Sequence, residues 1–195
     1  IFDGTEKGPL ATHGWTSSAG QSAFDVRFGA AIGVADFDAD GLDELLVGAP
    51  GLDGEAVNVG AFFVYTRACA TCPLSINATQ SFDGVSAQDQ LGFSIAVIGD
   101  TDADGTLEVA VGAPSGLNHD AGEVGHVYIY SSAADTLRDT PSVTLTGQPG
   151  ALFGYSVSAA GDVNGDGFAD LIVAARYETV FGTLDRGAAY LFLGG

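Results

Sequence analysis

Three short acidic segments of the sequence share the pattern D-x-[DN]-x-D-G-x-x-[DE], and an apolar run follows each one at once. Side chains at loop positions 1, 3 and 5 can turn toward one centre, and the glycine at position 6 permits a sharp turn. Position 7 offers its backbone carbonyl, and the acid at position 9 closes the cage. A cage of hard oxygen atoms suits Ca²⁺, which takes about 6–8 oxygen ligands.

The pattern predicts three Ca²⁺ sites, one in each segment. The predicted ligands are Asp36, Asp38, Asp40, Leu42 and Glu44 in the first, Asp100, Asp102, Asp104, Thr106 and Glu108 in the second, and Asp162, Asn164, Asp166, Phe168 and Asp170 in the third. The alternative for one isolated Asp-Gly cluster is an ordinary turn, because Asp, Asn and Gly favour turns for local reasons. Three copies in register favour metal binding. An EF-hand loop is longer and ends on a helix, whereas a strand is expected to follow here.

The elements that must position these loops repeat along the chain. The loops begin at residues 36, 100 and 162, and a glycine-led apolar run follows each of them, at 60–65, 125–130 and 187–192. In the first two units a further short segment closes on a glycine, at 80–84 and 143–147. Glycine, proline and aspartate turns separate these runs, and none has helical periodicity. The sequence therefore predicts an all-β fold of β-propeller-type blades, with four short antiparallel strands in a full unit.

The phase of the repeat predicts the domain boundaries. Residues 28–84 form blade 1, residues 85–147 form blade 2, and residues 148–195 form blade 3, which lacks its own fourth strand. Residues 1–4 resemble the fourth-strand segment 81–84, so we interpret them as the outer (fourth) strand of a preceding or partner blade. We expect this strand to complete the third blade, either of the same chain or of a neighbouring copy. Three blades fall short of the ~4–8 of a closed ring, which favours donation by a neighbouring copy over self-closure.

Residues 5–27 fit no repeat and are interpreted as an insertion, either a binding loop or a packing cap. Because the sequence starts at Ile1 without an initiator methionine, we expect a processed product or an excerpt of a longer chain.

Charge excludes some classes of partner. Lys and Arg number 6 against 25 Asp and Glu, for a formal charge of −19. Nucleic-acid binding needs a basic footprint, and an anionic membrane surface would repel this chain, so neither partner is expected. No apolar run approaches the ~20 residues that span a bilayer, so direct membrane insertion is not expected either.

Cys69 and Cys72 form a C-x-x-C pair, which is compatible with a redox pair, half a zinc site or a small disulfide loop. A redox pair should open a helix, and a zinc site needs two more ligands, whereas the histidines are scattered along the chain. We therefore predict a disulfide. Asn77 begins an Asn-Ala-Thr sequon and is predicted to carry a glycan. Together these features favour an extracellular or cell-surface location.

Phe28-Gly29 is followed by an acidic loop and then by residues 45–50, which read Leu-Leu-Val-Gly-Ala-Pro. This order of motifs resembles the FG-GAP repeat of integrin α-subunit β-propellers. The resemblance covers nearly the whole chain except residues 5–27. It implies three four-stranded antiparallel FG-GAP blades with Ca²⁺ between the first and second strands of each. Because that family's propeller has more blades, it also implies a partial propeller or a unit of a larger assembly.

Three features depart from the family pattern. Glu44 and Glu108 stand where the family has aspartate at position 9, and Leu91 stands where phenylalanine is expected. In the third unit, residues 174–176 read Ala-Ala-Arg in place of Gly-Ala-Pro. The first two should alter the fit of the loops slightly, and the third should loosen a turn.

Two readings of function follow. The leading one is a calcium-stabilised structural or adhesion module that contacts other protein chains, including head-to-tail copies of itself that exchange strands into a surface filament. The alternative is a fragment of a larger integrin-like propeller that binds a ligand or glycan. An enzyme is not expected: some FG-GAP-like proteins carry lyase or phospholipase activity, but the sequence has no G-x-S-x-G, H-E-x-x-H or P-loop. A calcium-bridged lectin is less favoured because the loops saturate their metal internally.

Overall fold

The computed structural model describes residues 26–37, 39–69, 71–116, 122–133, 136–180 and 185–195. Every regular element in this part of the chain is a β-strand, and all strand pairs are antiparallel. None of the described segments forms a helix of the length and apolar character needed to cross a membrane.

The strands form three sheets that follow the three repeats. The first contains β1 (Ile32–Ala35), β2 (Glu44–Ala49), β3 (Ala61–Tyr65) and β4 (Gln80–Asp83) in chain order. The second contains β5 (Ser94–Gly99), β6 (Glu108–Ala113) and β7 (Val124–Ala133), with β8 (Thr136–Leu137) and β9 (Val143–Pro149) both paired to β7. The third contains β10 (Phe153–Gly161), β11 (Asp170–Ala175) and β12 (Ala188–Phe192).

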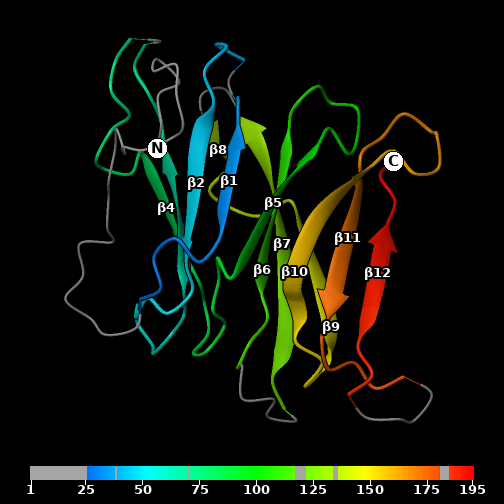
Figure 1. Ribbon diagram of the computed structural model, residues 1–195. Helices are drawn as coiled ribbons and strands as arrows, with labels where there is room; N and C mark the ends of the chain where they lie inside the picture. The colour runs from blue at the N-terminus through cyan, green and yellow to red at the C-terminus, as the bar shows by residue number, and fades with distance from the viewer. Residues whose placement is uncertain (1–25, 38, 70, 117–121, 134–135, 181–184) are drawn as a thin grey trace, which may run out of the picture.

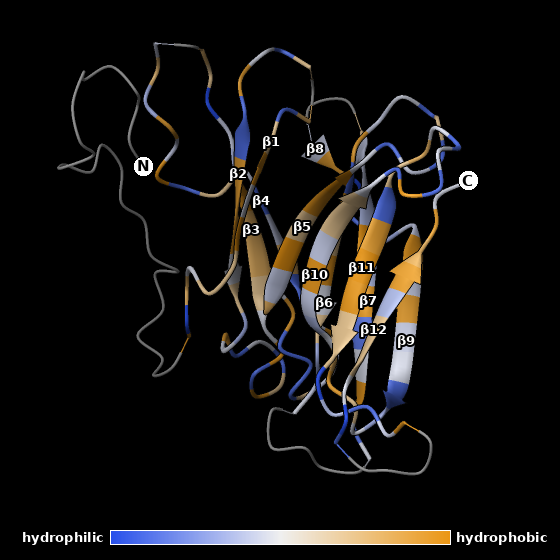
Figure 2. Ribbon diagram, turned by 45° about the vertical axis from the view of Figure 1, so that its right-hand side comes forward, coloured by the Kyte–Doolittle hydropathy of each residue, from blue (hydrophilic) through white to orange (hydrophobic). Residues whose placement is uncertain are grey.

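The sheets pack face to face in chain order, with the first strand of each sheet in contact with the first strand of the next (Figure 1). This is the arrangement of consecutive propeller blades, so the predicted all-β, partial-propeller fold is confirmed. Apolar residues are concentrated along the strands, and hydrophilic segments at the loops (Figure 2). The third sheet has three strands among the described residues. Its predicted completion by residues 1–4, and most of the predicted insertion 5–27, lie outside them.

The inner strands of the middle sheet pack on both faces, because alternate side chains point to opposite neighbouring sheets. Val109 and Val111 of β6 pack into a cluster with the first sheet, whereas Ala110 packs into a cluster with the third. On β7, Tyr130 faces the first sheet and Val127 faces the third. All six residues of β6 are buried, and after Glu108 the strand is a continuous apolar run that does not alternate with polar residues, as expected of a strand covered on both faces.

A stack of aromatic rings closes the contact between the first and second sheets. Phe62 and Phe82 lie parallel with ring centroids 4.4 Å apart, and Tyr130 meets both rings edge-on at 5.2 and 5.1 Å. Beside them Leu137 is 1% exposed. The side-chain amide of Gln80 donates to the Leu137 carbonyl at 2.9 Å and accepts from its N–H at 3.0 Å, so it holds β8 in place.

The short strand β8 is a difference from the predicted four strands of a full unit. Its physical basis is the burial of Leu137 in the cluster with the aromatic rings, together with the two hydrogen bonds with Gln80. Between the second and third sheets lies a groove of about 480 Å³. The second sheet lines it with Ile98, Ile129 and Leu145, and the third sheet lines it with Leu171 and Phe192.

Two glycines set the distance between neighbouring sheets. A Cβ on Gly48 of β2 would overlap the carbonyl oxygen of Gly92 in the next sheet and lie 2.9 Å from its carbonyl carbon. A Cβ on Gly112 of β6 would overlap the carbonyl oxygen of Gly154 and lie 3.2 Å from its carbon. Neither Gly48 nor Gly112 has a positive φ, so the requirement for glycine comes from the close approach of two backbones and not from strain.

We expect Gly48→Ala and Gly112→Ala each to lower the free energy of unfolding by about 1–3 kcal/mol, because the methyl group forces two packed sheets apart. Urea melts of the single variants measure this change. Gly122→Ala is the matched control, because a Cβ there would meet nothing within 4 Å. If the urea midpoints of Gly48→Ala and Gly112→Ala were as high as that of Gly122→Ala, the backbone contacts at these two glycines would not limit the packing of the sheets.

Candidate metal centres

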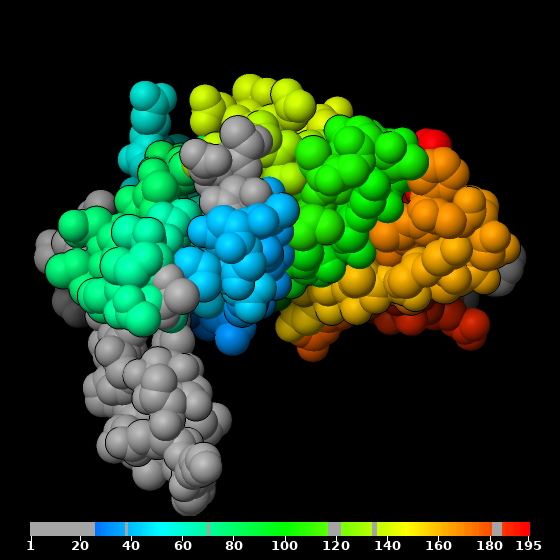
Figure 3. Space-filling model, turned by 90° about the horizontal axis from the view of Figure 1, so that it is seen from above, coloured from blue at the N-terminus to red at the C-terminus, as the bar shows by residue number. Residues whose placement is uncertain are grey.

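The three acidic loops connect the first and second strands of their sheets, β1 to β2, β5 to β6 and β10 to β11. All three lie at the same end of the sheets, at the top of Figure 1. Figure 3 looks down on this end, where the segments follow one another from blue through green to orange. The fold therefore presents three equivalent loops side by side.

The aspartate at loop position 1 holds the turn. In each loop its carboxylate accepts the backbone N–H of the position 6 glycine, which has a positive φ. The bonds run from Gly41 to Asp36 at 3.0 Å, from Gly105 to Asp100 at 3.0 Å and from Gly167 to Asp162 at 2.9 Å. In the third loop the N–H groups of Gly167, Gly165 and Asp166 together hold the pKa of Asp162 below its usual value.

The aspartate at position 5 accepts the backbone N–H of position 7. The bonds run from Leu42 to Asp40 at 2.7 Å, from Thr106 to Asp104 at 2.8 Å and from Phe168 to Asp166 at 3.0 Å. Thr106 adds a bond from its hydroxyl, and this bond, followed by the backbone bond, lowers the pKa of Asp104. The carboxylates at positions 1 and 5 thus define the turn through the backbone N–H groups that they accept.

The acid at position 9 is buried at the start of the second strand, with Glu44 and Glu108 each 2% exposed and Asp170 fully buried at 0%. Each accepts the backbone N–H of loop position 2. The bonds run from Phe37 to Glu44 at 2.9 Å, from Thr101 to Glu108 at 2.8 Å and from Val163 to Asp170 at 2.7 Å. Glutamate and aspartate therefore reach the same donor, and the departure at Glu44 and Glu108 leaves the network intact.

The second loop brings three carboxylates together. Asp100, Asp102 and Glu108 each offer a ligand atom, and these atoms all lie within 4.8 Å of one another. Burial raises the pKa of Glu108, and the carboxylates of Asp102 and Asp104 act in the same direction, while hydrogen bonds from Thr101 oppose them. This concentration of negative charge on oxygen donors suits a hard divalent cation.

The first loop is described less completely than the second, and the third loop is less acidic than the second. Asp38 lies outside the described residues, so the predicted position 3 ligand of the first loop is not placed. In the third loop the position 3 residue is Asn164, whose amide donates to Asp166 at 2.6 Å. Replacing a carboxylate with an amide at this position leaves the third loop with less negative charge than the second.

Two features of the loops were missed by the sequence pattern. Position 4 has a positive φ in every loop, 59° at Ala39, 59° at Ala103 and 77° at Gly165. The small residue at this position in all three copies was the available signal. The hydroxyl of Thr101 also donates to Glu108 at 3.0 Å, a contact that only the folded loop reveals.

The second loop is hydrogen-bonded to the residues that flank β11 and β12 of the third sheet. The Ala169 N–H donates to the carbonyl of Asp100 at 2.9 Å, and the Gly195 N–H donates to the carbonyl of Thr101 at 2.9 Å. Gly194 donates its N–H to Asp170 at 2.9 Å. Ordering of the loops is therefore coupled to the contact between sheets.

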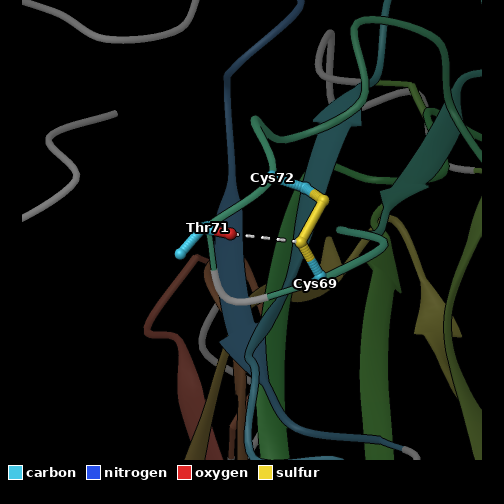
Figure 4. Close-up of a disulfide and its surroundings, with 3 residues drawn as sticks. All are labelled: Cys69, Thr71 and Cys72. Carbon is cyan, nitrogen blue, oxygen red and sulfur yellow. Dashed lines mark hydrogen bonds between the residues drawn. A yellow bond between two sulfur atoms is a disulfide. The ribbon is translucent and has the colours of Figure 1, made fainter.

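The connection between β3 and β4 contains the cysteine pair. Cys69 and Cys72 are joined by a disulfide with a Cα–Cα distance of 5.0 Å, and the hydroxyl of Thr71 lies 3.5 Å from the sulfur of Cys69 (Figure 4). Asn77 is exposed in the same connection, and its N–H donates to the hydroxyl of Ser75 at 3.2 Å. Its glycan stays a prediction.

Comparison with known proteins identifies the repeats. The family model of the FG-GAP repeat matches residues 28–65, 91–130 and 153–192, which are the three segments that carry β1–β3, β5–β7 and β10–β12. The chain belongs to the FG-GAP repeat family. Each matched segment contains one acidic loop, and the first two also contain Gly48 and Gly112 of the inter-sheet contacts.

The FG-GAP repeats are similar to those of integrin alpha subunits. Integrin alpha-5 of Xenopus laevis is 35% identical over 162 residues, which is 76% of this chain and 14% of that protein. Integrin alpha-E of Mus musculus is 36% identical over 78% of this chain, and integrin alpha-V of Gallus gallus is 35% identical over 76%. The chain spans 14–15% of the length of these relatives.

We predict that the third loop binds Ca²⁺ more weakly than the first, because affinity in such loops follows ligand charge and rigidity. Calorimetric titration of Asp162→Ala should lose the weakest binding phase of the wild-type protein. Asp36→Ala should lose a tighter phase. Loss of the tightest phase in Asp162→Ala would contradict the ranking.

Proposed function

We propose that this chain is a calcium-stabilised, extracellular binding module of the integrin-like FG-GAP type. The observation that carries the proposal is the carboxylate network, which recurs with the same donors and acceptors in all three loops. Three unrelated turns would have no reason to bury an acid at the same position.

The donor set fits a divalent cation better than it fits an ordinary turn. A buried carboxylate is costly unless it is paired or hydrogen-bonded. Glu108 faces two further acids, Asp100 and Asp102, with ligand atoms within 4.8 Å. A cation held by the predicted ligands of each loop would relieve this repulsion and satisfy oxygen lone pairs that the N–H donors leave unused.

Calcium would act on the module by stiffening one end of the sheets. The carbonyls of Asp100 and Thr101 accept hydrogen bonds from the third sheet, so a cation that orders this loop also strengthens the contact between sheets. A rigid end with three adjacent loops is a suitable platform for recognition, since rigid scaffolds position the loops that bind partners.

The partner we propose is another protein chain at the cell surface, by analogy with the integrin alpha subunits that the chain resembles. A binding role is favoured over catalysis because the acids of the loops are engaged by backbone donors that shape a metal cage. Residues 1–4 lie outside the described residues, so strand exchange between copies stays a prediction, as does glycan binding.

The extracellular assignment is tested by intact-mass analysis of native material. We expect Cys69 and Cys72 to be oxidised and Asn77 to carry a glycan, because both lie in an exposed connection away from the sheet core. Asn77→Gln should lose the mass of the glycan and keep the disulfide. Two free thiols together with an unmodified Asn77 would refute this part of the proposal.

Calcium removal tests the proposal itself. A ligand that binds only the folded state stabilises it by about 2.7 kcal/mol at a concentration 100 times its Kd, so EDTA should lower the Tm and added calcium should restore it. Asp36→Asn should reduce the calcium-dependent shift in Tm. Asp43→Asn, an exposed acid of the same loop outside the ligand pattern, should leave the shift unchanged. An identical Tm with EDTA and with calcium would contradict the proposal.

A further inference from the structure

The third loop contains the only Asn-Gly pair of the sequence, Asn164-Gly165. Asn164 occupies loop position 3, where the other two loops have aspartate, and both residues of the pair are exposed to solvent. An asparagine followed by glycine is chemically labile, because glycine has no Cβ to keep the next backbone nitrogen away from the asparagine side chain. The pair therefore places a reactive amide among the predicted metal ligands of this loop.

The reaction open to this pair is deamidation. The backbone nitrogen of Gly165 attacks Cγ of Asn164, so that a new C–N bond forms and the bond from Cγ to Nδ2 breaks. The side-chain nitrogen leaves as ammonia and takes with it the proton that the Gly165 nitrogen carried. Water then opens the cyclic imide, at the side-chain carbonyl to give aspartate or at the main-chain carbonyl to give isoaspartate. Water is the only co-reactant, and the exposed pair is in contact with it.

Hydrogen bonds of the closed loop restrain both reacting groups. The Gly165 N–H donates to the carboxylate of Asp162 at 2.6 Å, so this nitrogen keeps its proton. Asp166 holds the Asn164 side chain at both ends. The Asn164 amide donates to the Asp166 carboxylate at 2.6 Å, and the Asn164 side-chain oxygen accepts the Asp166 N–H at 3.2 Å. Attack requires these bonds to break, because the nitrogen must lose its proton and the side chain must turn toward it.

We propose that Asn164 is a deamidation site, protected while the third loop is closed by these bonds and exposed to attack when the loop opens. Asp162 and Asp166, which supply the restraining carboxylates, are also the predicted ligands at positions 1 and 5. A cation held by them keeps the loop closed, so the calcium dependence of the reaction rests on the proposed function. A group that reacts only in an open state reacts in proportion to the population of that state.

The two products have opposite consequences for the loop. Aspartate at position 164 gives the third loop carboxylates at positions 1, 3 and 5, as the second loop has, and so more negative charge to hold a cation. Isoaspartate carries the main chain through the former side chain and lengthens it, which displaces the Gly165 N–H from Asp162. The ratio of the products therefore decides whether the loop gains a ligand or loses its turn.

Glycine is not required at position 4 for the turn itself. The other two loops have Ala39 and Ala103 there, each with a φ of 59°, against 77° at Gly165. A Cβ on Gly165 would meet nothing within 4 Å among the described residues. Gly165→Ala should therefore keep the closed loop, while its methyl group hinders attack on Asn164. This variant separates the chemistry of the pair from the fold of the loop.

Peptide mapping of the full chain by mass spectrometry measures the reaction, with aspartate and isoaspartate peptides separated by chromatography. We expect the wild-type protein to deamidate at Asn164 slowest in calcium, faster in EDTA and fastest in urea. The rate in urea should exceed the rate in calcium by about tenfold or more, because the closed loop is then absent. In urea, Gly165→Ala should deamidate several-fold more slowly than the wild type.

A pair of matched variants tests the role of the hydrogen bond to Gly165. Asp162→Ala removes the acceptor of the Gly165 N–H, so Asn164 should deamidate several-fold faster than in the wild type, in calcium as well as in EDTA. Asp36→Ala makes the same change in the first loop and should leave the rate at Asn164 unchanged. Equal acceleration in both variants would attribute the effect to a general loss of stability and would contradict local protection.

Three further results would overturn the inference. The first is a wild-type rate in calcium equal to that in urea, and the second is a Gly165→Ala rate in urea equal to that of the wild type. The third is an equal rate in calcium and in EDTA although the Tm shifts with calcium, which would leave the proposed calcium module standing. If the Tm does not shift, the proposed function fails, and the comparison of EDTA with urea still tests protection by the loop.

Discussion

A buried carboxylate at the start of the second strand of each sheet is the constraint on which the loops depend. Glu44, Glu108 and Asp170 are almost fully removed from water, and each accepts the N–H of loop position 2. Burial of a charge without compensation is costly, and in each loop the N–H of position 2 supplies part of that compensation. The same turn geometry, with positive φ at positions 4 and 6, accompanies this buried acid in all three loops.

Backbone contacts between neighbouring sheets hold the three loops next to one another. Gly48 and Gly112 let neighbouring sheets approach until backbone atoms touch, which places the loops side by side at one end. Hydrogen bonds from Ala169 and Gly195 to the second loop then couple the loop to the next sheet.

The repeat predicted the fold well because its signals are local. Apolar runs bounded by glycine specify strands, and their recurrence specifies blades, as the three sheets and the family match confirm. The two-residue strand β8 was not foreseen, because a segment of that length carries no periodic pattern and is held by tertiary contacts of Leu137 with the core and with Gln80. The predicted acids occupy equivalent places in the loops, but their unequal burial depends on packing that no loop pattern contains. The inter-sheet role of Gly48 likewise becomes visible only when a second sheet is present.

Hydrogen exchange of the backbone amides, measured with calcium and then with EDTA, tests the metal-centred account most directly. The amides of Gly41, Gly105 and Gly167 each donate to the position 1 aspartate of their loop. Calcium should slow their exchange in all three loops, because a bound cation holds those aspartates in place. The inner strand β6 should stay protected in both conditions. Exchange in the loops that is equally fast with calcium and with EDTA would contradict the account.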